Sequence, residues 1–91
     1  MTDNRLVFVL CVRSWWDGTN PYHSMRLVHP NGDSEILTKF RYGRNFVEDA
    51  TESLKTIYPT VTDWHPYGGQ VKFVVDETEV SRRKDLHGGG R

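Results

Sequence analysis

One amphipathic segment constrains the fold of this 91-residue chain more than any other feature. Between Asn45 and Pro59, apolar residues recur at the three- and four-residue spacing that places side chains on one face of a helix. Asn45 can cap the first turn, Glu48 stands where a capping-box acid would stand, and Pro59 ends the helix. The apolar stripe consists of Phe46, Ala50, Leu54 and Ile57, with Val47 and Tyr58 beside it. Another layer of structure must cover this stripe.

Four further segments have the residue pattern of β-strands. Residues 5–13 form a nearly continuous run of branched and aromatic residues, which is typical of a central strand covered on part of both faces. In residues 22–29 and 34–41, the side chains divide between two faces with the two-residue period of a strand. A last strand is predicted over residues 70–76, after an aromatic loop.

The order of these segments predicts the fold class. Asn31-Gly32 joins the second and third strands and favours a type I′ hairpin turn. The order is then β-β-β-α-β, and the simplest arrangement is an α+β domain in which one helix packs on one face of an antiparallel sheet of about four strands. We expect this single domain to span residues 1–80. From residue 81 the apolar pattern stops, so residues 81–91 are predicted to be a flexible, basic and glycine-rich tail.

Composition disfavours several classes of function. Twelve basic and twelve acidic residues cancel, so the chain lacks the broad positive field that draws proteins to nucleic acid. The longest apolar run, residues 6–12, is too short to cross a bilayer or to act as a secretory signal. Cys11 is the only cysteine, which fits a reducing compartment. We therefore expect a cytoplasmic protein without a membrane partner.

The residues that could carry catalysis or bind metal do not form a recognisable pattern. The histidines are His23, His29, His65 and His87. No pair of them has the spacing of a zinc site, and His23 and His29 would lie about 20 Å apart along a strand. We expect hydrogen-bonded histidines at the surface or at a sheet edge. The sequence thus predicts no enzyme, no metal and no cofactor.

Two aromatic segments are the most unusual feature. Trp15 and Trp16 precede an Asp-Gly pair, and Trp64 and Tyr67 precede a Gly-Gly pair. The first segment is predicted to be a loop or a wide hairpin end and the second a loop, and tryptophan and tyrosine are enriched in binding hot spots. The alternative is that one tryptophan from each loop closes an end of a thin core. Because two adjacent tryptophans cannot both turn inward easily, at least one of Trp15 and Trp16 should remain partly exposed.

A group of basic residues lies just before the predicted helix. It consists of Lys39, Arg41 and Arg44, with Gly43 beside Arg44. The free N–H groups at the start of a helix can hold an anion, so a phosphate site is physically reasonable here. The glycine pattern of a nucleotide-binding loop is missing, however. The alternative is a tight turn from strand to helix with solvated arginines.

Residues 22–54 combine two short motifs. The strand Tyr22-His23-Ser24-Met25-Arg26 is followed, after a hairpin, by Phe40-Arg41-Tyr42-Gly43, which leads into a helix with Ala50 and Leu54. This third of the chain resembles small uncharacterised accessory proteins of tailed bacteriophages. The chain departs from that pattern at Arg44, where a second aromatic residue or a glycine often stands. The resemblance implies a phage gene product acting inside an infected bacterium, and it carries over no site residues.

These observations lead to two hypotheses of function. The first is a small non-enzymatic module that binds a host protein through Trp15, Trp16, Trp64 and Tyr67. The second is a protein that binds nucleic acid or a nucleotide through Lys39, Arg41 and Arg44. The oligomeric state stays open, although an exposed edge strand could support a dimer.

Overall fold

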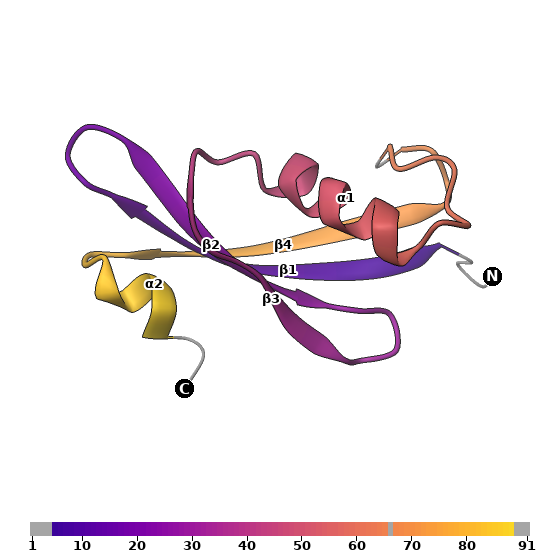
Figure 1. The fold of residues 1–91 in the computed structure, drawn as a ribbon, viewed down its shortest axis with the longest axis horizontal. Helices are drawn as coiled ribbons and strands as arrows, with labels where there is room; N and C mark the ends of the chain where they lie inside the picture. Colours follow the sequence, from indigo (N-terminus) through magenta and orange to yellow (C-terminus); the bar gives the residue numbers. More distant parts are fainter. Residues whose placement is uncertain (1–4, 66, 89–91) are drawn as a thin grey trace.

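The computed structural model describes residues 5–65 and 67–88, which form a four-stranded sheet with one helix on each side (Figure 1). The α+β class and the four strands are confirmed. The elements in chain order are β1 (Leu6–Trp16), β2 (Pro21–Val28), β3 (Ser34–Tyr42), α1 (Phe46–Ile57), β4 (Val71–Val80) and α2 (Lys84–Gly88).

The sheet is mixed, so the predicted wholly antiparallel sheet is wrong. Its strand order is β3-β2-β1-β4; β2 pairs antiparallel with β1 and β3, whereas β4 is parallel to β1. The reason lies in the direction of α1. Phe46 at its start packs against His23, opposite the end of β1, and Tyr58 after its last turn packs against Phe8 near the beginning of β1. The chain thus returns to the start of β1, and a strand that begins there must run parallel to it.

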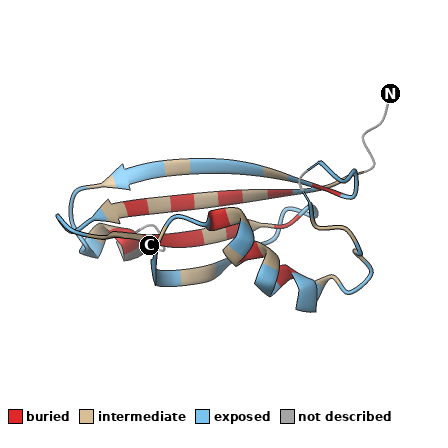
Figure 2. Cartoon of the chain, turned by 90° about the horizontal axis from the view of Figure 1, so that it is seen from above, coloured by how far each residue is buried: buried red, intermediate tan, exposed pale blue. Residues whose placement is uncertain are grey.

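The predicted helix is confirmed, and the main core lies between α1 and the sheet (Figure 2). Every second residue of β1 points toward α1 and is buried, while the residues between them point to the opposite face of the sheet, as the pleat of a strand requires. Asn45 occupies the cap position, but its side chain makes no capping hydrogen bond. The buried apolar residues of this core are Phe8, Leu10, Val12, Met25, Leu27, Phe46, Ala50, Leu54 and Val71.

The turn between β2 and β3 differs from the predicted type I′ turn. Gly32 has φ of 95°, but Asn31 has no positive φ. The Gly32 N–H donates to the His29 carbonyl, and the His29 N–H donates to the Asp33 carbonyl. This is the pattern of a type I turn followed by a glycine bulge, and Pro30 favours it because its fixed φ suits the first central position.

The second face of the sheet carries α2. Residues 81–91, which the sequence pattern assigns to a flexible tail, include this short helix, and its Leu86 is buried. Ser24 Oγ donates to the Leu86 carbonyl at 2.6 Å, and Arg13 donates to the Asp85 carbonyl at 2.9 Å. Residues 89–91 lie outside the described part. None of the described helices has the length and apolar character needed to span a bilayer.

Candidate functional site

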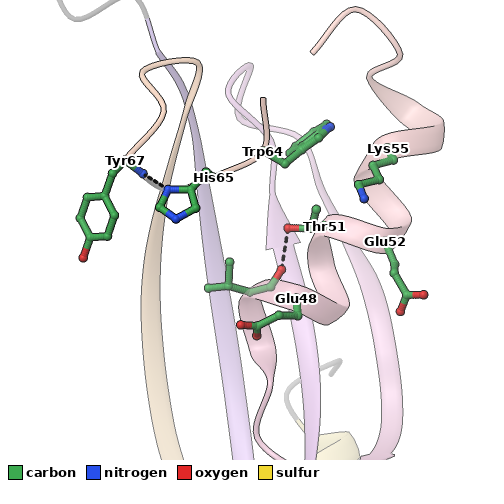
Figure 3. Close-up of a pocket in the computed structure, with 8 residues that line it drawn as sticks. Glu48, Thr51, Glu52, Lys55, Trp64, His65 and Tyr67 are labelled. Carbon is green, nitrogen blue, oxygen red and sulfur yellow. Dashed lines mark hydrogen bonds between the residues drawn. The ribbon is translucent and has the colours of Figure 1, made fainter. Parts of the chain in front are cut away.

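A groove runs along the outer side of α1 and is closed by the loop that leads to β4 (Figure 3). Its volume is about 580 Å³. Two of the four aromatic residues that the sequence singles out, Trp64 and Tyr67, line it together with residues of the helix. We call it the Trp64 groove, and its lining residues are Val47, Glu48, Thr51, Glu52, Lys55, Trp64, His65 and Tyr67.

The loop that presents these aromatic residues is held by its own hydrogen bonds. The Gln70 side-chain oxygen accepts from the N–H groups of Thr62 and Asp63, at 2.9 and 3.1 Å. The Asp63 carboxylate accepts from the His65 N–H at 3.0 Å, and the His65 ring nitrogen accepts from the Tyr67 N–H at 3.1 Å. Four backbone N–H groups of the described loop residues, those of Thr62, Asp63, His65 and Tyr67, therefore have side-chain partners that hold them in place.

A glycine in this loop has a steric role. A methyl group added at Gly68 would overlap the Asp63 carboxylate. The same carboxylate fixes the His65 backbone. Only the smallest residue therefore lets the loop close tightly behind Tyr67.

The two aromatic residues of the groove have different environments. Trp64 is half-buried, and its ring centroid lies 6.0 Å from that of Phe8 in the core. Tyr67 is 91% exposed, and its nearest ring is His65 at 5.5 Å. Figure 3 shows Trp64 on the side of Lys55, with Tyr67 pointing away from the helix. Trp64 thus anchors the loop to the core, while Tyr67 is displayed to solvent.

Acidic side chains dominate the helix wall of the groove. Glu48, Thr51, Glu52 and Lys55 lie along this wall (Figure 3). Glu52 lies 3.7 Å from Arg41, whereas Glu48 has no ion-pair partner among the described residues. The unpaired carboxylate of Glu48 suits a cationic group, and the ring of Trp64, beside Lys55 at the other end of the wall, suits an apolar one.

The other predicted aromatic pair lies in β1 rather than in a loop. β1 continues to Trp16, and the turn that follows is short. Trp16 is 61% exposed, which confirms that at least one of the two adjacent tryptophans faces water. Trp15 lies on the opposite face of the sheet, where its ring is 5.7 Å from Tyr22 and 6.5 Å from Phe40.

Asp17 explains why the strand is longer than predicted. Its carboxylate accepts hydrogen bonds from the N–H groups of Thr19 and Asn20, at 2.7 and 2.6 Å. These bonds hold the pKa of the Asp17 carboxyl below its usual value of 3.8, with the bond from Asn20 contributing most. The turn closes within four residues, so strand pairing extends to Trp16 and Pro21.

The two aromatic sites do not form one surface. Trp64 packs against Phe8 near the start of β1, whereas Trp16 is the last residue of β1. At about 3.3 Å per residue, Phe8 and Trp16 are roughly 26 Å apart along the strand. A single small partner could not contact Trp16 and Tyr67 together.

The predicted anion-binding residues are largely paired with carboxylates. Arg41 lies 3.3 Å from Asp49, and Arg44 lies 2.7 Å from Glu77. The guanidinium of Arg44 also lies over the Phe46 ring, 5.5 Å from its centroid. Lys39 is exposed on β3. Two of the three cations are thus neutralised by acids, which weakens the case for a phosphate site.

A buried polar cluster under α1 was not anticipated from the sequence. His23 is fully buried; its Nδ1 lies 2.8 Å from the Gly43 carbonyl, and its Nε2 lies 3.4 Å from Asp49 Oδ2. Ser14 is the cross-strand neighbour of His23, and its buried Oγ has no hydrogen-bond partner among the residues that the structure describes. Serine, histidine and aspartate side chains together form the catalytic triad of many hydrolases. None of the three lines the Trp64 groove, however.

His29 forms a second buried interaction. Its Nε2 lies 2.6 Å from Glu35, and its Nδ1 lies 2.7 Å from the Tyr58 hydroxyl. Burial raises the pKa of Tyr58, and the nearby carboxylates of Glu35 and Asp33 raise it further. The expectation that His23 and His29 lie at the surface is therefore wrong. Their alternation with Met25 and Leu27 was the signal for the buried face.

Within residues 5–65 and 67–88, no group of three or more histidine, cysteine or acidic side chains could hold a metal ion. Comparisons with models of protein families, with curated proteins and with solved structures found no match.

Proposed function

We propose that the chain is a small non-enzymatic module that binds another protein through the Trp64 groove. The observation that carries this proposal is the 91% exposure of Tyr67 on a loop whose backbone is fixed by hydrogen bonds. An exposed tyrosine on a rigid support desolvates a large area on binding and loses little conformational freedom.

The groove suits a peptide segment with a basic residue beside an apolar one. Glu48 offers an unpaired carboxylate to a lysine or arginine at one end of the groove. Trp64 lies beside Lys55, about two helical turns further along, and offers its ring to an apolar side chain of the same segment. Tyr67 points away from the helix, so its ring would contact the part of the segment that continues past the loop. The resemblance to phage accessory proteins favours a host protein in the cytoplasm of an infected bacterium as the source of this segment.

The nucleic-acid hypothesis receives less support. Arg41 and Arg44 already contact carboxylates, and the helix wall of the groove is acidic. Both features oppose the approach of a phosphate backbone.

Affinity capture from bacterial lysate, analysed by mass spectrometry, tests the proposal. Tyr67→Ala should abolish enrichment of the partner, because it removes the displayed ring without touching the core. Tyr42→Ala is the matched control, since Tyr42 is an exposed tyrosine on β3. The proposal fails if Tyr67→Ala retains the same enriched proteins as the wild type, or if both variants lose them equally.

A further inference from the structure

The face of the sheet opposite α1 is only partly covered. α2 packs over the end of this face that carries Arg13 and Ser24, and both side chains donate hydrogen bonds to backbone carbonyl groups of α2. The rest of this face has no covering element among the described residues, and three of its valine and isoleucine side chains are 36 to 46% exposed. We call this region the open face, and its apolar residues are Val7, Val9, Cys11, Val28, Ile36 and Val74.

The open face is large enough to form an interface. Four strands spaced by about 4.8 Å, and about six residues of length along β1, give roughly 20 by 19 Å. This amounts to about 400 Å² of flat area on each copy and about 800 Å² in total, the size of a weak interface rather than a tight one. The apolar residues adjoin one another on this face, which they share with Arg26, Ser34, Lys72 and Asp76.

Two charges on β4 are self-complementary across the open face, whereas Arg26 on β2 shares this face and donates to Ser34 Oγ at 3.4 Å. Lys72 and Asp76 lie on β4, two residues before and two residues after Val74, so all three side chains share this face. Both charged residues are exposed, and neither has an ion-pair partner among the described residues. A surface with a positive charge on one side of an apolar centre and a negative charge on the other can bind the same surface of a second copy.

We propose that the open face binds a second copy of this chain to form a two-fold symmetric dimer. The axis would lie between the two sheets, perpendicular to the strands, and pass over Val9 and Val74, which are paired neighbours. This rotation places Lys72 of each copy over Asp76 of the other. It also places Val7 against Cys11, because they stand on either side of Val9.

The position of α2 selects this arrangement over its alternative. If the axis were parallel to the strands, the end of each sheet that α2 covers would face the same end of the other sheet. Two stacked sheets lie only about 10 Å apart, so each α2 would overlap the opposing sheet. With the perpendicular axis, each α2 lies beyond the end of the other copy's open face. The sheets then stack with nearly aligned strands, as in a β-sandwich.

The test is sedimentation equilibrium of the full chain from about 1 to 500 µM, the range in which an interface of this size should dissociate. Lys72→Asp and Asp76→Lys should each raise the dimer dissociation constant about tenfold or more, because each creates two like-charge pairs. The double variant Lys72→Asp/Asp76→Lys should restore wild-type association. Both positions are exposed, so the variants should fold, and circular dichroism checks this. The proposal is overturned if the chain stays monomeric up to about 500 µM. It is also overturned if the charge-reversal variants have the same dimer dissociation constant as the wild type.

A cross-linking experiment distinguishes this dimer from others. In the variant Val9→Cys/Cys11→Ser, the only cysteine lies on the proposed axis, so a short bis-maleimide should join two copies. In Ile57→Cys/Cys11→Ser, the cysteine is exposed on α1 and should not react across the dimer. Equal cross-linking of both variants, or cross-linking of the second alone, would show association through another surface. The Trp64 groove lies on the other side of the sheet, so its proposal can fail independently.

Discussion

Asp17 shows how one side chain sets the length of a strand. Because its carboxylate accepts two backbone N–H groups, its folded pKa lies below its usual value of 3.8. A depressed carboxyl pKa means that the turn is stabilised above the unfolded pKa and that this contribution is lost as the pH falls through the folded value. The affected window therefore lies below about pH 4.

An NMR titration of the side-chain carboxyl measures this directly. We expect the Asp17 midpoint below 3.8, together with pH-dependent shifts of the Thr19 and Asn20 amides. Asp17→Asn keeps an acceptor oxygen, so it should preserve the turn and remove the pH dependence of those amides. A midpoint at or above the usual value would contradict the assigned hydrogen bonds.

The residue scale also shows where sequence reasoning succeeds and fails. The exposure of at least one of Trp15 and Trp16 was predicted, because two adjacent tryptophans cannot both turn inward easily; that both belong to β1 was not predicted. The burial of His23 and His29 was missed. The partners of the buried ring nitrogens come from other elements: Gly43 bonds to Nδ1 of His23, and Tyr58 and Glu35 bond to the two ring nitrogens of His29. Nε2 of His23 has only the longer contact of 3.4 Å with Asp49.

Among the elements, α1 was predicted almost to the residue, because its stripe follows from local periodicity alone. The direction of β4 was not predicted. It depends on which way α1 crosses the sheet, and that crossing is fixed by long-range packing of Phe46 on His23 and of Tyr58 on Phe8. β4 also extends to Val80, beyond the predicted end at Asp76, because pairing with β1 continues through its acidic part.

The bond from Tyr58 to His29 ties the end of α1 to the β2–β3 hairpin. Tyr58→Phe removes the hydroxyl and leaves a buried ring nitrogen of His29 without its partner. We expect the free energy of unfolding, measured in urea, to fall by about 1–3 kcal/mol. Tyr42→Phe, at an exposed position, should change it by less than about 0.5 kcal/mol. Equal effects of the two substitutions would show that the bond does not join the elements.

At the scale of the whole molecule, the sheet separates two surfaces. α1 lies on one side of the sheet and α2 on the other (Figure 1). The Trp64 groove lies beside α1, and the open face lies beside α2. Trp64 and Tyr67 could be identified from sequence because they stand out as aromatic residues in a loop. Their association with Glu48 could not, because only the folded chain brings the loop beside the wet face of the helix.

Selection of peptides from a random display library on the immobilised protein tests the central claim most directly. The groove should enrich peptides that carry lysine or arginine next to an aromatic or branched residue. Glu48→Arg should lose this preference for basic residues, and Tyr67→Ala should enrich nothing above background. If peptides are selected without a charge preference, or equally well on the Tyr67→Ala protein, the Trp64 groove is not the binding site.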